Sequence, residues 1–381
     1  MKKLLCLLLT ALLLLCSCTT RVKPQIDVSE KYYYLTSHVE YGNGSTATLL
    51  HRFNVENGSM TPLCPDPLCE HSEEAGCPFA GALNYAVDGD TIWFNRKLNN
   101  RDRESATVIC RYDIADGKLR VLQEYKDDGY TYMFKFGYLW KYFSHNDPTE
   151  DDISVRVSLD EENFDEPEEI DPNKIPFAQV GDVYYYGAYG TYHSPATEVY
   201  AMYTDLTDEW LVADDVFSMN FEYYDGFLYY IQDGTLMRVS VDEEITGIPV
   251  NTKETVKKAV AAYFFYDNAL FYLQSEGEEA EVIGWDEFLE EDVKNTYGGK
   301  IWRAQPDGSK AKVFTQTDGY VISKSMLSNA QVGSRLVMRY GCWKDKQRYG
   351  ETYRAWRSTE GGLLVIDLND GTYQGYAVFD E

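Results

Sequence analysis

The sequence predicts an all-β chain that folds as a single β-propeller, and three observations point to this fold class. Short aromatic segments recur along the chain with a spacing of roughly 40 to 60 residues. Gly, Asp and Asn residues, which favour tight turns, flank these segments. The chain also contains 32 tyrosines, a residue type that suits strands and tolerates a partly hydrated sheet edge. Short sheets that repeat on this period and bury their faces against neighbouring copies are the blades of a propeller.

The clearest copy of the repeat is residues 223–250, YYDGFLYYIQDGTLMRVSVDEEITGIPV. Two Asp-Gly dipeptides in this copy are hairpin signals, and they predict strands at 227–231 and 236–241. The other six copies each contain two predicted strand regions, namely 31–37 and 47–55, 91–94 and 107–114, 130–143 and 153–159, 181–186 and 198–206, 266–273 and 300–304, and 335–340 and 362–368. The pattern therefore predicts an aromatic strand, a variable loop and a second strand in every copy.

This count predicts seven blades, with six or eight as alternatives. The copy that begins at residue 130 matches the pattern weakly, and no innermost strand is evident before residue 31. The terminal runs 32–35 and 373–379 are expected to share a blade and to close the ring. Closure matters because an open sheet edge would template aggregation.

Three insertions separate the two strands of a copy, at 97–106, 277–299 and 341–359. Within the second, WDEFLEEDV at 285–293 is expected to form a short amphipathic helix. The third combines basic residues with four aromatic candidates for ligand binding, which are Trp343, Tyr349, Tyr353 and Trp356. Insertions in repeat folds often mark the binding face. The alternative is that these aromatic residues only pack a long hairpin.

The repeat pattern resembles the TolB-like and YWTD-like propellers of bacterial surface lipoproteins, many of which have no assigned function. The resemblance extends over most of the chain after the N-terminal segment, and it implies one rigid ring outside the cell. No Trp-Asp dipeptide recurs from copy to copy, and the Asp boxes that mark another propeller class are absent from the sequence.

The N-terminal residues MKKLLCLLLTALLLLCSCTT are typical of an export signal. Two lysines precede an apolar run at 4–15, and this run is shorter than the ~20 residues that a membrane-spanning helix needs. The tetrapeptide LCSC at 15–18 resembles the lipobox of bacterial lipoproteins. This resemblance implies cleavage before Cys18 and diacylation of its sulfur. Two acyl chains are sufficient for stable membrane attachment.

These features predict a signal peptide at 1–17, a lipidated cysteine with a short tether at 18–28, and a propeller domain at 29–381. The folded part is expected to be exported and held at the outer face of the bacterial cytoplasmic membrane by its diacylglycerol-cysteine. The alternative is an ordinary signal peptide with incidental cysteines.

The net charge of −27 excludes some classes of partner. Nucleic acid binding requires clustered Lys and Arg, so no nucleic acid partner is expected. Electrostatic adhesion to anionic lipid is disfavoured for the same reason, and the acyl anchor must therefore supply the membrane attachment.

A compact group of soft ligands lies in CPDPLCEHSEEAGCPF at 64–79. Three thiols and one imidazole, from Cys64, Cys69, His71 and Cys77, form a suitable set for one structural zinc ion with no open coordination position. The competing interpretation is a disulfide, which exported proteins favour. Five cysteines follow Cys18, so complete pairing would leave one thiol free.

No sequence motif indicates catalysis. The chain has no phosphate-binding loop, no nucleophile elbow, no zinc-protease motif and no EF-hand loop. The preferred interpretation is a non-catalytic propeller that binds an extracellular glycan, peptide or partner protein. The alternatives are a glycan-active hydrolase or lyase with carboxylates at the propeller channel, and a structural scaffold of a surface complex.

Overall fold

The computed structural model describes residues 31–40, 46–66, 68–72, 76–99, 105–126, 130–143, 153–160, 167–187, 198–214, 221–240, 253–274, 282–286, 291–294, 300–317, 320–322, 331–348 and 351–378. The predicted signal peptide and tether, including Cys18, lie outside these residues. None of the helices within the described ranges has the length and apolar character that crossing a membrane requires.

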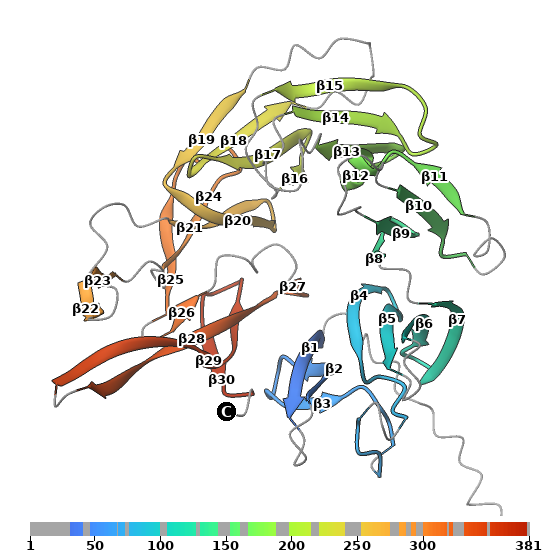
Figure 1. The fold of residues 1–381 in the computed structure, drawn as a ribbon. Helices are drawn as coiled ribbons and strands as arrows, with labels where there is room; N and C mark the ends of the chain where they lie inside the picture. Colours follow the sequence, from blue (N-terminus) through green and yellow to red (C-terminus); the bar gives the residue numbers. More distant parts are fainter. Residues whose placement is uncertain are drawn as a thin grey trace, which may run out of the picture.

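Seven antiparallel sheets follow one another along the described part of the chain and surround a common centre (Figure 1). Blade 1 contains β1 (Tyr32–Glu40), β2 (Thr46–Asn54) and β3 (Met60–Pro62), and blade 2 contains β4 (Ala82–Asp88), β5 (Thr91–Asn99), β6 (Ser105–Asp113) and β7 (Lys118–Lys126). Blade 3 contains β8 (Thr131–Lys135), β9 (Tyr138–Phe143), β10 (Ile153–Ser158) and β11 (Glu168–Ile170), which a short 3-10 helix (Pro172–Lys174) follows.

The remaining blades continue this order. Blade 4 contains β12 (Pro176–Val180), β13 (Val183–Gly187), β14 (Glu198–Tyr203) and β15 (Glu209–Asp214), and blade 5 contains β16 (Phe221–Tyr224), β17 (Phe227–Gln232), β18 (Thr235–Ser240) and β19 (Glu254–Lys258). Blade 6 contains β20 (Val260–Tyr266), β21 (Ala269–Gln274), β24 (Lys300–Ala304) and β25 (Lys312–Gln316). Blade 7 contains β26 (Val321–Ile322), β27 (Gln331–Val332), β28 (Arg335–Arg348), β29 (Glu351–Asp367) and β30 (Tyr373–Tyr376).

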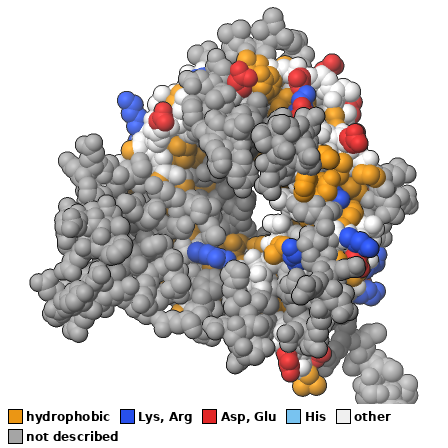
Figure 2. Space-filling view, in the orientation of Figure 1, with side chains coloured by type: hydrophobic (Ala, Val, Ile, Leu, Met, Phe, Trp, Pro, Cys, Tyr) orange, Lys and Arg blue, Asp and Glu red, His pale blue; other side chains and the backbone are white. Residues whose placement is uncertain are grey.

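The hydrophobic core is divided among the interfaces between blades. Each of the seven buried clusters found in the described residues joins two neighbouring blades, including a cluster between blade 7 and blade 1. Seven sheets with seven interfaces make a closed ring, so the predicted all-β, seven-bladed propeller is confirmed. The alternatives of six and eight blades are wrong. The molecular surface is hollowed at the centre of the ring (Figure 2).

Strand alternation explains the aromatic sequences. Successive side chains of a strand point to opposite faces, and in β17 Leu228 and Tyr230 pack toward blade 4 while Tyr229 packs toward blade 6. Both faces of a central strand are therefore buried, and its sequence becomes a continuous apolar and aromatic run instead of an alternating one. This is the physical reason for segments such as FLYYIQ and for the large number of tyrosines.

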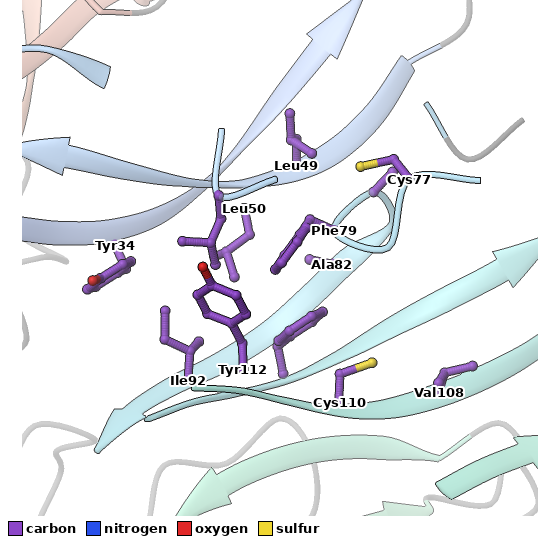
Figure 3. Close-up of a cluster of buried hydrophobic side chains, with 13 residues drawn as sticks. Tyr34, Leu49, Leu50, Cys77, Phe79, Ala82, Ile92, Val108, Cys110 and Tyr112 are labelled. Atoms are coloured by element: carbon purple, nitrogen blue, oxygen red, sulfur yellow. The ribbon is translucent and has the colours of Figure 1, made fainter. Parts of the chain in front are cut away.

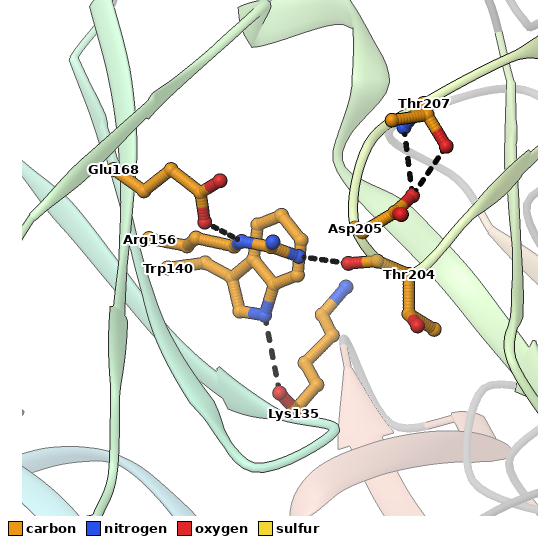
Figure 4. Close-up of polar contacts among 7 residues, drawn as sticks. All are labelled: Lys135, Trp140, Arg156, Glu168, Thr204, Asp205 and Thr207. Atoms are coloured by element: carbon orange, nitrogen blue, oxygen red, sulfur yellow. Dashed lines mark hydrogen bonds and ion pairs between the residues drawn. The ribbon is translucent and has the colours of Figure 1, made fainter.

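Polar side chains also join neighbouring blades (Figure 4). Arg156 of β10 is buried, and its Nε donates to Glu168 Oε2 at 2.7 Å within blade 3. Its Nη1 donates to the carbonyl oxygen of Thr204 in blade 4 at 2.8 Å. The guanidinium also lies over the Tyr138 ring, 4.5 Å from the centroid. This cation thus has both a carboxylate and a carbonyl partner, as a buried charge requires.

The ring closes by packing between the first and last blades and not by a shared sheet. β30 pairs with β29, and β1 pairs with β2, so the prediction that the terminal runs share a blade is wrong. Blade 7 obtains all its strands from its own segment of the chain. The seam is held by a buried apolar cluster and by Arg339, whose Nη2 donates to the carbonyl oxygen of Thr36 at 3.1 Å.

The predicted helix at 285–293 is also wrong. β22 (Val282–Asp286) and β23 (Glu291–Lys294) form a two-stranded antiparallel sheet there. The insertion leaves from β21 and returns to β24, which are paired neighbours, so its two ends lie side by side and favour a hairpin. An isolated helix of about nine residues would also be marginal in water.

Candidate metal centre

The four predicted ligands lie on an excursion of the third strand of blade 1. The Leu63 N–H donates to the Leu50 carbonyl at 2.9 Å. The adjacent residue of β2, Leu49, forms an antiparallel bridge with Ala80. The chain therefore leaves the sheet after Leu63 and returns to it at Ala80, at adjacent positions of β2. The two ends of this excursion thus lie side by side at the junction between blades 1 and 2.

The fold brings the four side chains together. The ligand atoms of Cys64, Cys69, His71 and Cys77 all lie within 4.8 Å of one another. In a tetrahedral zinc site with Zn–S distances of about 2.3 Å, two sulfurs are separated by about 3.8 Å. Among the residues that the structure describes, this is the group of His, Cys, Asp and Glu side chains whose geometry suits a metal ion. The site could hold a metal with the predicted ligand set.

Backbone turns preorganise the loop. The Asp66 carboxylate accepts the Leu68 N–H at 2.9 Å, and the Asp66 carbonyl accepts the Cys69 N–H at 3.2 Å. The Cys69 sulfur accepts the His71 N–H at 3.4 Å, a local side-chain-to-backbone bond that competes with regular secondary structure. His71 adopts a left-handed backbone conformation with a φ of 57°, which turns its ring back toward the cysteines.

Burial controls the electrostatics of the cluster. Cys77 is only 1% exposed, and burial raises its pKa to about 12. Burial also raises the pKa of Cys64, and the neighbouring Cys69 thiol adds to this effect. In the absence of a cation these thiols keep their protons. A bound divalent ion reverses this preference, because it favours the deprotonated thiolate as a ligand.

The cluster is part of the core between blades 1 and 2 (Figure 3). Cys77 packs with Phe79 and with β2 residues such as Leu49, and Cys110 of β6 lies in the same apolar cluster. Cys64, Cys69, Cys77 and Cys110 are all free thiols in the structure. A metal bound by the loop would therefore lie next to the interface between blades 1 and 2.

The predicted ligand-binding aromatic residues have a different location. Trp343 lies on β28, and Tyr353 and Trp356 lie on β29, while Tyr349 falls outside the described residues. These strands are in blade 7, away from the metal centre in the sequence and in a different sheet.

Two functional candidates were not predicted from the sequence. Arg96 of β5 donates from Nη1 to the carbonyl oxygen of the ligand Cys77 at 3.0 Å. Glu222 of β16 accepts the Phe265 N–H on Oε1 at 3.3 Å, while its buried Oε2 has no hydrogen-bond partner in the described part of the chain. The Phe265 carbonyl accepts the side-chain amide of Gln331 at 3.0 Å, so groups from blades 5, 6 and 7 meet there. The one available signal for Glu222 was a carboxylate within the aromatic strand FEYY.

Neither a protein-family model nor a curated protein matches this sequence. Solved structures of propellers are similar at low identity. The β-propeller domain of the Trilobed protease from Pyrococcus furiosus is 10% identical, with a TM-score of 0.48, over 92% of this chain and 96% of that one. A chain from a study of two prolyl endopeptidases is 11% identical, with a TM-score of 0.48, and 92% of this chain matches 50% of that one, so this chain spans about half its length. A putative 6-phosphogluconolactonase from Bacteroides fragilis is 12% identical, with a TM-score of 0.40, over 91% of this chain and 99% of that one.

Proposed function

We propose that this chain is an exported, lipid-anchored binding protein whose propeller presents a two-stranded arm of blade 7 to an extracellular glycan with acidic groups. In this proposal the metal centre binds one structural zinc ion. The arm is the observation that carries the proposal, because it extends the sheet beyond what the blade requires.

The arm consists of the distal parts of β28 and β29. β26 pairs with β28 only up to Gly341, and β30 pairs with β29 only from Leu363 onward. Beyond these points β28 and β29 continue as a two-stranded ribbon, and their pairing extends to Arg348 opposite Glu351. Figure 1 shows the arm leaving the ring, with the β22–β23 hairpin nearby.

The residues of the arm suit an anionic or sugar ligand. Trp343 pairs directly with Trp356, and Tyr353 pairs with Lys346. Residues directly opposite in a ladder share one face of the ribbon. The arm also carries Lys344, Lys346, Arg348, Arg354 and Arg357, in a chain whose net charge is −27. Aromatic residues supply apolar stacking surfaces for sugar rings, and the basic residues pair with carboxylate or sulfate groups.

Zinc suits the metal centre on the chemistry of its donors. Thiolate and imidazole are soft or intermediate ligands that select zinc over calcium or magnesium, which prefer oxygen. Four protein ligands would fill a tetrahedral shell and leave no position for a substrate or a reactive water. The zinc ion in this proposal therefore stabilises the loop and takes no part in a reaction.

The membrane anchor is tested with Cys18→Ala in the cell that makes the protein. We expect this variant to leave the membrane fraction and to lose incorporation of a labelled fatty acid, because Cys18 carries the acyl chains in the proposal. Continued labelling of Cys18→Ala would contradict the assignment of the anchor.

Ligand binding is tested on a glycan and peptide array with the released Cys18→Ala protein. The arm predicts binding to acidic glycans, and we expect Trp343→Ala/Trp356→Ala to weaken it by about tenfold or more, as the loss of a central aromatic contact does. Tyr373→Ala, which removes an exposed aromatic residue of the same blade outside the arm, is the control and should bind normally. Selective binding to peptides, or equal binding by the arm variant, would overturn the proposed ligand or the role of the arm.

A further inference from the structure

Arg96 lies between the metal loop and the neighbouring strand of blade 2. It is a residue of β5, where it pairs with Ala82 of β4 and Val108 of β6. Its Nη1 donates to the Cys77 carbonyl at 3.0 Å, and its guanidinium also makes a hydrogen bond to the Cys110 thiol. The guanidinium thus contacts the backbone of a predicted metal ligand from the side of the apolar core.

Arg96 is half-buried, and its guanidinium has no negatively charged partner among the described residues. Its Nε is buried and has no hydrogen-bond partner in the described part of the chain. No carboxylate of the described residues forms an ion pair with it; its contacts there are a carbonyl and a thiol. A buried polar atom without a hydrogen-bond partner costs free energy, and a nearby negative charge would offset part of this cost. Arg156, by contrast, is buried with a carboxylate at 2.7 Å.

The proposed zinc centre supplies the missing charge. Three thiolates and a neutral imidazole around a divalent cation leave a net charge of −1, and this charge would lie in the core cluster that contains Cys77. We propose that Arg96 is the charge partner and positioning residue of the metal–thiolate centre. In this role it holds the zinc-bound loop of blade 1 against β5 of blade 2. This inference rests on the proposed zinc site.

The inference predicts different effects of Arg96→Met on the metal-free and the zinc-loaded protein. In the metal-free protein no carboxylate of the described residues pairs with the half-buried Arg96, so Arg96→Met should change thermal stability little. In the zinc-loaded protein the same change removes the charge partner of the centre. Outer-shell partners of metal sites typically account for a change in affinity of about 10–100-fold, and we expect Arg96→Met to weaken zinc binding by this factor.

The experiment uses the full mature chain with three variants. Zinc affinity is measured by competition with a chelating dye, thermal unfolding is measured with and without metal, and Co²⁺ spectra report the ligand set. Arg96→Met should bind zinc more weakly while its Co²⁺ complex keeps the thiolate charge-transfer band of a four-coordinate site. Arg96→Lys should recover most of the affinity because it retains the charge.

Arg111→Met is the matched control. Arg111 lies on β6 and pairs with Asp113 at 3.0 Å, so its loss should lower the stability of both forms equally and leave zinc affinity unchanged. Unchanged zinc affinity in Arg96→Met, or an equal loss of stability in its metal-free and loaded forms, would overturn the role of Arg96. A wild-type protein that binds no zinc in the same titration would instead overturn the zinc site, and with it this inference.

Discussion

Cys77→Ser is expected to weaken zinc binding by more than about a hundredfold and to lower the thermal midpoint of the metal-loaded protein toward that of the metal-free protein. Apparent zinc-binding free energies of four-ligand sites are about 10–16 kcal/mol, so an equal share per ligand is about 3 kcal/mol and corresponds to a loss of affinity of more than about a hundredfold. Cys77 is 1% exposed and lies in the cluster between blades 1 and 2. Loss of the metal should therefore loosen this blade interface first. Zinc content and thermal unfolding with and without chelator measure both effects.

Cys110→Ser is the control for this experiment. Cys110 is fully buried in the same apolar cluster but is not one of the four converging ligands. It should lose some stability through the burial of a hydroxyl group while it keeps one zinc ion per chain. Full zinc binding by Cys77→Ser, or equal zinc loss in the two variants, would show that the cluster is not the metal site.

Glu222→Gln is expected to make the chain more stable than the wild type at pH 8. Burial raises the pKa of Glu222 from its ordinary value of 4.5 to about 7, against the opposing hydrogen bond from the Phe265 N–H. The folded state thus holds the proton more tightly than the unfolded state. The contribution of this group is fully present below about pH 4.5, falls as the pH rises to 7, and is absent above that value.

The size of this effect follows from the two pKa values. The difference between 4.5 in the unfolded chain and about 7 in the folded chain corresponds to about 3 kcal/mol, and partial exposure of the side chain reduces this to about 1–3 kcal/mol. The amide introduced by Glu222→Gln can still accept the Phe265 N–H and has no charge to desolvate. The difference in unfolding free energy between wild type and variant, measured by denaturant titration from acid to alkaline pH, isolates the contribution of this one group.

Glu254→Gln is the control for the pH experiment. Glu254 is an exposed carboxylate of blade 5 that pairs with Arg238 at 2.8 Å, so its substitution should destabilise the chain slightly at neutral pH. A Glu222→Gln variant that is no more stable than the wild type at pH 8 would contradict the raised pKa of Glu222. The phenol of Tyr263 is the neighbouring titratable group of blade 6 that influences the same carboxyl environment.

Much of the fold could be predicted because the central strands of each blade are buried on both faces. The strands expected at 227–231 and 236–241 are β17 (Phe227–Gln232) and β18 (Thr235–Ser240). Outer strands such as β11 (Glu168–Ile170) and β19 (Glu254–Lys258) are short and largely polar, so they have no hydrophobic pattern that would reveal them. The sequence at 285–293 does not reveal the hairpin β22–β23, because the hairpin follows from the pairing of the flanking strands β21 and β24.

The candidate site could be predicted in part, because its four ligands are close together in the sequence. Soft ligands close together in the sequence can meet through local turns alone, and the fold does bring the four of them together. Arg96 could not be predicted, because it reaches the loop through the pairing of β4 with β5 and through the packing of blade 1 on blade 2. Glu222 depends on contacts with two other blades. Such long-range partners leave no periodic signal in a single sequence.

The metal content of the protein, purified without chelator, tests the central claim most directly. Elemental analysis gives the zinc content, and thiol counting by mass spectrometry after denaturation gives the number of reduced cysteines in the same sample. The proposal predicts one zinc ion per chain and reduced thiols at Cys64, Cys69 and Cys77. Less than about a tenth of an equivalent of zinc, together with a disulfide between two of these cysteines, would contradict a metal-held loop between the first two blades.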